Sequence, residues 1–219
     1  GRSKVDGVDF LPLARSGLVV IALDPHRHAF SEGTPRGTAD VPNIFVDDFV
    51  CLASAYDCGR ETINELPYFV CGESFGGCIS LLTGLRIQKA AQQATHRSIG
   101  SVDIDVDRFK GVVAICAAIA VAAPGQCFVR CIDCCCGTCC PTWKVPVPPT
   151  DFKEASQNQE DRDYMIYATT HRPTTRDDES IWHRLTYRGG VTLLDLIHLL
   201  CQSLHTVSFP FIAIHDPGD

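Results

Sequence analysis

The sequence predicts an α/β fold in which a mostly parallel sheet is flanked by helices. Short apolar, β-branched runs recur along the 219 residues, and segments with a helical spacing of apolar side chains separate them. Such alternation is typical of βαβ units, whose crossover helices pack on a parallel sheet. Hydrophobic residues make up 45% of the chain and charged residues 21%, which is the composition of a globular protein.

The first strand and the first helix are expected in the first quarter of the chain. Residues 17–23, GLVVIAL, form a continuous apolar run before Asp24, as in a strand buried on both faces of a parallel sheet. Residues 45–56 space aromatic and aliphatic side chains three and four apart, as an amphipathic helix does. A polar loop is expected between these two elements.

Three more strands and two more helices are expected further along the chain. Residues 68–71 predict a short strand, and residues 77–93 predict a helix rich in Leu, Ile and Ala. Further strands are predicted at residues 111–116 and 209–215. The last helix is expected to begin at Thr192, whose side chain suits an N-cap.

A long stretch without strand patterns separates the last two predicted strands. It is too long for an ordinary connection, so we expect an inserted subdomain with structure of its own. The sequence therefore predicts a core in two parts, residues 1–122 and 207–219, with a cap insertion at residues 123–206 between them.

The charge balance argues against a nucleic-acid partner. The net charge is −7 at pH 7, the pI is about 5.6, and no stripe of Lys and Arg is present. No apolar run approaches the roughly 20 residues that span a bilayer. Residues 1–15 also lack the pattern of a signal peptide, so we expect a cytoplasmic protein.

The segment CGESFGGC, residues 71–78, carries the clearest catalytic signal. Its G-x-S-x-G pattern directly follows a predicted strand and leads into a predicted helix, which is the context of a nucleophile elbow. Ser74 is the expected nucleophile, and the backbone N–H of Phe75 is an expected oxyanion donor. Gly72 and Gly76 are expected where the turn brings backbones too close for side chains. The alternative is a glycine-rich turn with an idle serine.

With these motifs the chain resembles the monoacylglycerol lipase and lysophospholipase branch of the α/β-hydrolases, a branch grouped with serine aminopeptidase-like hydrolases. GESFGG at 72–77 resembles the family's G-[HE]-S-M-G-G elbow, with Phe75 in place of methionine. Leu23-Asp24 and residues 31–37 resemble a strand end and its D-H-x-G-x-G-x-S-E-G-x-x-x-G loop. Three later stretches are similar to a strand, a cap segment and the strand that carries the triad acid: 109–113, 141–144 and 209–219.

The resemblance implies an α/β-hydrolase fold with a cap and a serine hydrolase activity. The expected substrate is a carboxylic ester of a lipid, of the monoacylglycerol or lysophospholipid type, cleaved through an acyl-enzyme without a cofactor. Asp219 is the implied triad acid, with Asp216 in reserve. The triad order of the family is Ser, Asp, His, so no histidine before Asp219 is expected to be the base.

The chain also departs from the family pattern. Arg27 and Ala29 stand where the family has glycines, and Asp216 stands where it has the glycine after the strand histidine. The family's His-Gly oxyanion loop and its catalytic histidine would lie outside the 219 residues, so we expect an inactive fragment, incomplete at both ends. These departures support an alternative, a non-catalytic α/β-hydrolase scaffold that associates with membranes through its cysteine-rich cap.

Seven of the 13 cysteines lie within residues 127–140, in the expected cap. Cys131-x-x-Cys134 and Cys136-x-x-Cys139 have the spacing of zinc or iron–sulfur pairs. Only one residue separates the pairs, which is cramped for four ligands, so no metal is expected. The preferred interpretation is an apolar cap with reduced thiols that contacts lipid at the membrane surface. Reversible palmitoylation is the alternative.

Overall fold

The chain divides into two compact units, described separately below. The first comprises Gly1–Thr38 and Ile132–Gly190, and the second comprises Ala39–Cys131 and Val191–Asp219. The division into a core at 1–122 and 207–219 and a cap at 123–206 stays a prediction. The computed structural model describes residues 11–27, 31–33, 43–57, 66–92, 98–99, 102–103, 106–119, 139 and 186–215.

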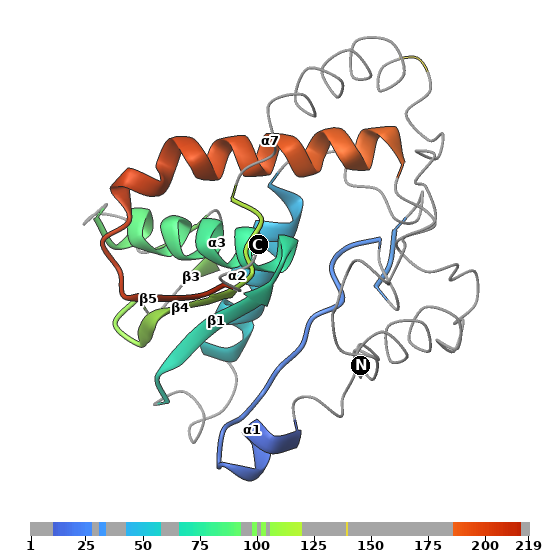
Figure 1. The fold of residues 1–219 in the computed structure, drawn as a ribbon. Helices are drawn as coiled ribbons and strands as arrows, with labels where there is room; N and C mark the ends of the chain where they lie inside the picture. The colour runs from blue at the N-terminus through green and yellow to red at the C-terminus, as the bar shows by residue number, and fades with distance from the viewer. Residues whose placement is uncertain are drawn as a thin grey trace. The chain divides into compact units, whose positions relative to one another are not determined.

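A three-stranded parallel sheet forms the centre of the second unit (Figure 1). Its strands are β1 (Tyr68–Glu73), β4 (Phe109–Ile115) and β5 (Phe211–Ile214), in the order β1-β4-β5. The register pairs Glu73 with Ile115 and Ile115 with Ile214, so the carboxyl ends of all three strands are level. The expected parallel sheet and its three strands in this unit are confirmed.

Three helices accompany this sheet. They are α2 (Ile44–Asp57), α3 (Phe75–Gln92) and α7 (Tyr187–Ser203). Residues 191–203 of α7 belong to this unit. The helices expected at 45–56 and 77–93 are thus confirmed, with α3 beginning two residues earlier. A short 3-10 helix, η3 (Leu204–Thr206), leads from α7 toward β5. A two-stranded antiparallel pair, β2 (Ser98–Ile99) and β3 (Val102–Asp103), follows α3.

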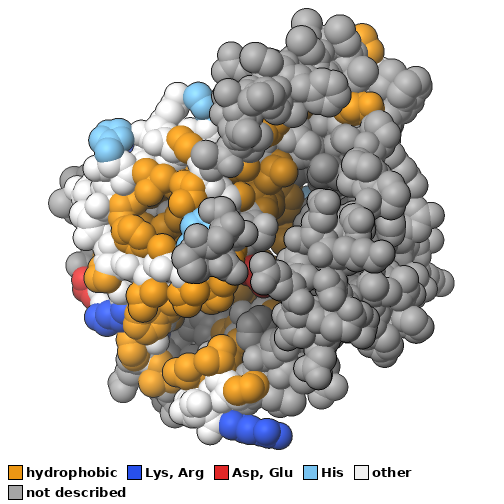
Figure 2. Space-filling view, viewed as in Figure 1, with side chains coloured by type: hydrophobic (Ala, Val, Ile, Leu, Met, Phe, Trp, Pro, Cys, Tyr) orange, Lys and Arg blue, Asp and Glu red, His pale blue; other side chains and the backbone are white. Residues whose placement is uncertain are grey.

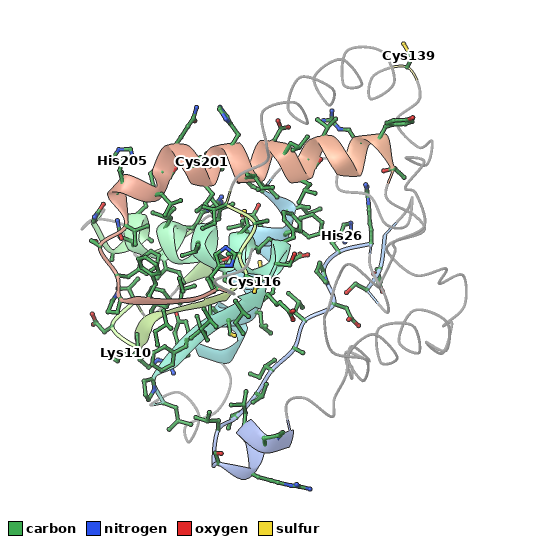
Figure 3. All side chains as sticks on the ribbon, in the orientation of Figure 1. His26, Lys110, Cys116, Cys139, Cys201 and His205 are labelled. Carbon is green, nitrogen blue, oxygen red and sulfur yellow. The ribbon has the colours of Figure 1, made fainter. Side chains whose placement is uncertain are left out.

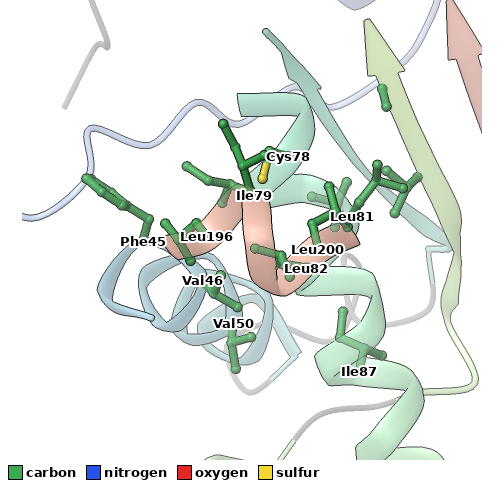
Figure 4. Packing of buried hydrophobic residues seen from close by; sticks show 14 residues of the cluster. Phe45, Val46, Val50, Cys78, Ile79, Leu81, Leu82, Ile87, Leu196 and Leu200 are labelled. Atoms are coloured by element: carbon green, nitrogen blue, oxygen red, sulfur yellow. The ribbon is translucent and has the colours of Figure 1, made fainter. Parts of the chain in front are cut away.

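The hydrophobic core lies where α2, α3 and α7 meet the strands (Figure 4). Leu196 and Leu200 lie one turn apart on α7 and are 0% exposed, as is Cys78 of α3. Val46 of α2 and Val112 of β4 complete the packing. Burial of each large aliphatic side chain contributes about 1.5–3 kcal/mol, so this cluster fixes α3 and α7 against the sheet.

Other apolar side chains of the strands are exposed. Phe69 on β1 is 62% exposed, and Ile212 and Ile214 on β5 are 60% and 50% exposed. All four residues of β5 are exposed, and β5 pairs with β4 at one end of the strand order. Figure 2 shows the hydrophobic side chains on the viewed face of this unit. The packed core is therefore on the side of the sheet that α3 covers.

The strand expected at residues 17–23 is not formed. The first unit contains α1 (Leu11–Arg15), and residues 18–25 follow it without helix or strand. Leu18 and Val19 are 56% and 60% exposed. The apolar run has the side chains of a strand, but a strand also needs a neighbour to complete its backbone hydrogen bonds. No strand supplies them within the part of this unit that the structure describes.

The last helix begins five residues before Thr192, the N-cap expected from the sequence. The first residue of α7 is Tyr187, and the true cap is Thr186, whose Oγ1 accepts a hydrogen bond from the N–H of Gly189 at 3.0 Å. Thr192 is instead 1% exposed, inside the helix. Glycines at 189 and 190 carry no side chain, so the apolar periodicity becomes visible only from Val191 onward.

No helix in the described part of the chain is long and apolar enough to cross a bilayer.

Candidate active site

Ser74 is the single residue between the end of β1 and the start of α3, and its φ is +53°. This left-handed backbone costs an L-residue about 1–2 kcal/mol, and such strain is concentrated at functional sites. Two bonds to other segments hold it: the Ser74 N–H donates to the Ile115 carbonyl at 2.8 Å, and the Ala118 N–H donates to the Ser74 carbonyl at 3.0 Å. The strand, strained serine and helix have the geometry of a nucleophile elbow.

The glycines around Ser74 have different steric roles. A Cβ on Gly72 would lie 2.1 Å from the carbonyl oxygen of Gly76, so Gly72 has the close approach expected of it. The same expectation is wrong for Gly76, because a Cβ there would meet nothing within 4 Å. Gly76 contributes its backbone to the close contact, while its own side-chain direction is open.

Gly77 is a constrained position that the sequence analysis missed. A Cβ on Gly77 would lie 2.7 Å from the Cβ of Ala117, which follows β4. The signal was the second glycine of the Gly76-Gly77 pair, which lies outside the five-residue pattern. The first turn of α3 is therefore packed directly against residues 116–119.

Phe75 begins α3, so its backbone N–H belongs to the first turn of an 18-residue helix. The N–H groups of a first turn have no intrahelical acceptor, and the helix dipole favours negative charge beside them. The Phe75 ring packs edge-on against Phe45 of α2, with ring centroids 5.7 Å apart. This packing anchors the residue whose N–H was expected to be an oxyanion donor.

The level strand ends bring two further residues, Cys116 and His215, to the same edge of the sheet as Ser74. Ser74, Cys116 and His215 each directly follow a strand, and the Cys116 N–H donates to the Ile214 carbonyl at 2.7 Å. The expected acid Asp219 and the reserve Asp216 follow β5 but lie outside the described residues. The chain leaves β5 at the same edge of the sheet as Ser74. The assignment of Asp219 as the triad acid is compatible with this position and stays a prediction.

The two cysteines that flank the elbow are protonated at neutral pH. Cys71 is exposed, but partial desolvation by its neighbours still raises the pKa of its thiol, and the Glu73 carboxylate raises it further. Burial raises the pKa of the Cys78 thiol to about 12, with the Cys201 thiol as a second cause. A thiol is a weak nucleophile compared with its thiolate, so neither of these two cysteines is activated as a nucleophile at neutral pH.

No histidine before Asp219 was expected to be the base, and two of these histidines lie on or just after α7. His198 and His205 are exposed, and His198 Nε2 lies 2.8 Å from Nε2 of Gln202. Figure 3 shows His205 beside the end of α7, away from Cys116. His171 and His183 lie outside the described residues.

The cysteine-rich segment is not described, apart from Cys139, which is exposed. Its expected lipid contact, its alternative palmitoylation and its lack of a metal therefore stay predictions. Within the described residues, no three His, Cys, Asp or Glu side chains are grouped as a metal site would require.

Comparison with known proteins agrees with this geometry. Residues 10–219 match the family model described as serine aminopeptidase, S33. Among solved structures, the chain is similar to the monoacylglycerol lipase of Paleococcus ferrophilus, with a TM-score of 0.52 and 15% sequence identity. The match covers 86% of this chain and spans 58% of that chain's length. No curated protein sequence matches the chain. The expected α/β-hydrolase fold is confirmed.

Proposed function

Because the chain belongs to the serine aminopeptidase S33 family of α/β-hydrolases, we propose that it is a serine hydrolase acting on carboxylic esters of lipids. The observation that carries the proposal is the left-handed Ser74 between a parallel strand and a helix. No role in the fold requires a serine there, because glycine would adopt this backbone without strain. Its presence is explained if the hydroxyl is needed for chemistry.

The proposed mechanism begins with attack of the Ser74 oxygen on the ester carbonyl. A histidine that follows the acid in the triad order would take the hydroxyl proton and then protonate the leaving alcohol, with Asp219 orienting it. The N–H of Phe75 would donate to the tetrahedral oxyanion, a type of contact worth about 10²–10³ in kcat. Water would then release the acyl group from the serine.

The substrate class is proposed from the family and from the similarity to a monoacylglycerol lipase structure. Monoacylglycerols and lysophospholipids both present one acyl ester to the nucleophile. We expect the cysteine-rich segment to contact lipid at a membrane surface, in a cytoplasmic setting. The alternative is a non-catalytic scaffold attached to membranes by this segment. An activity assay distinguishes it from the proposed hydrolase.

The test compares the whole protein with two alanine variants. Ser74→Ala removes the proposed nucleophile, and Ser80→Ala removes the hydroxyl of a buried serine in α3, the helix that follows Ser74, as a control. We expect hydrolysis of p-nitrophenyl butyrate and of a monoacylglycerol to fall at least about a thousandfold in Ser74→Ala and to persist in Ser80→Ala. A folded protein that hydrolyses no ester would support the scaffold instead.

A further inference from the structure

The loop Cys116–Ile119 directly follows β4 and lies against the elbow. It begins with a turn at Cys116, whose φ is +43° and whose N–H is bonded to Ile214 of β5. Ala117, Ala118 and Ile119 are half-buried and pack against the hydrophobic core. The loop is thus fixed to the sheet at its first residue, and its later residues depend on other contacts.

On one side, this loop supports Ser74. The Ala118 N–H donates to the Ser74 carbonyl at 3.0 Å, and Ala117 fills the space that Gly77 leaves open. The peptide group after Ser74 is therefore oriented by Ala118 as well as by the first turn of α3. Any displacement of Ala118 changes the orientation of the backbone that aims the Ser74 hydroxyl.

On the other side, the loop is held by α7. The Cys201 thiol is in direct contact with the Ile119 carbonyl oxygen, to which it is placed to donate a hydrogen bond. Cys201 directly follows Leu200, which is fully buried in the core, so the helix behind the thiol is anchored. Figure 3 labels Cys116 at the start of the loop and Cys201 on α7.

We propose that Cys201 is a positioning residue for Ser74. Its thiol holds Ile119, the loop holds Ala118, and Ala118 holds the strained backbone of the nucleophile. Each link is a direct contact in one compact unit, so a continuous series of packed and hydrogen-bonded groups joins Cys201 to Ser74. The inference rests on the proposed function, since it assigns Cys201 an effect on the reactivity of Ser74.

The brace itself is tested by hydrogen exchange, without any activity measurement. Cys201→Ala removes the donor, Cys201→Ser retains one, and Gln202→Ala changes the adjacent exposed residue, whose side chain contacts His198 instead. We expect amides of residues 116–119 to exchange about threefold to tenfold faster in Cys201→Ala. Exchange in Cys201→Ser and Gln202→Ala should match the wild type. Unchanged exchange in a folded Cys201→Ala protein overturns the brace.

The effect of Cys201 on the reactivity of Ser74 is tested with a fluorophosphonate probe, on the whole protein and the same three variants. Misorientation of the nucleophile lowers the maximal rate of labelling, so we expect a fall of about threefold to tenfold in Cys201→Ala, with an unchanged half-saturating probe concentration. Cys201→Ser should restore the rate. Faster exchange without a slower labelling rate overturns the positioning role alone. A wild-type protein that is not labelled at Ser74 overturns the proposed function as well.

Discussion

Ser74 and Arg27 share an unusual backbone and differ in what supports it. Both are left-handed, with φ of +53° and +66°, and they lie in different units of the chain. Ser74 is bonded to Ile115 and Ala118, which are distant in sequence, whereas the Arg27 N–H donates to the nearby Glu32 carbonyl at 2.9 Å. Tertiary contacts therefore hold the strained backbone at Ser74, whereas a local turn holds it at Arg27.

The same comparison revises one departure from the family pattern. Arg27 stands where the pattern of the resembled family places a glycine, and its backbone has the conformation that glycine adopts without cost. Gly33 in the same turn has a φ of +110°, and a Cβ there would lie 2.6 Å from the His26 ring. Arg27 therefore places an L side chain on a left-handed backbone, which is a strained conformation.

The largest expected effect at neutral pH follows from introducing a side chain into the close backbone contact of the elbow. In Gly72→Ala the new Cβ meets the Gly76 carbonyl, which belongs to the backbone of α3 and cannot rotate away. We expect the free energy of unfolding to fall by about 3 kcal/mol in urea titrations. The matched variant Gly76→Ala points into open space and should change stability by less than about 1 kcal/mol. Equal stabilities of the two variants would refute this account of the turn.

The buried thiol behind the elbow should give a pH dependence. Burial raises the pKa of Cys78 from 9.0 to about 12, so between these pH values the unfolded chain loses the proton that the folded protein keeps. The stabilisation is complete below pH 9 and is lost as pH rises, by up to about 1.4 kcal/mol per pH unit. Urea titrations of wild type and Cys78→Ala should therefore converge with rising pH. A constant difference between them would exclude this cause.

Relief of strain at Ser74, the proposed nucleophile, should stabilise the protein and remove the proposed activity. Ser74→Gly removes the Cβ from a left-handed residue. We expect its free energy of unfolding to exceed that of Ser74→Ala by about 1 kcal/mol, reduced by the greater conformational entropy of glycine in the unfolded chain. Differential scanning calorimetry of the two inactive variants measures this difference directly. If Ser74→Ala were the more stable variant, the strain would be absent.

Arg27→Gly should have the smallest effect. The turn at Arg27 is local, and part of its strain can be released by small movements, so a gain of about 0.5 kcal/mol is expected. Thermal unfolding monitored by circular dichroism would detect this gain in stability. Arg15→Gly is not a suitable control, because Arg15 lies in helix α1. A gain at Arg27 larger than that at Ser74 would reverse the comparison.

The sequence predicted the elements whose partners are also apparent in the sequence. Residues 68–71 formed a strand because Phe109–Ile115 pairs with them along their length. Residues 17–23 have an equally apolar pattern and formed none, because side-chain pattern specifies burial whereas pairing depends on another segment. Whether a partner strand pairs with a run cannot be read from that run's own residues.

The candidate site shows the same limit. The G-x-S-x-G pattern located Ser74, since a local strand-turn-helix junction is visible in consecutive residues. The contact of Gly77 with Ala117 and the bond from Cys201 to Ile119 join residues 40 and 82 positions apart. No local pattern marks such contacts, so they became visible only in the folded chain.

The most direct test of Ser74 as the nucleophile is a peptide map of the whole protein after reaction with a fluorophosphonate. Such a probe phosphonylates an activated serine and spares ordinary hydroxyls. The account predicts one adduct, on the peptide that contains Ser74, and none in Ser74→Ala. An adduct on another residue, or no adduct on a folded protein, would contradict it.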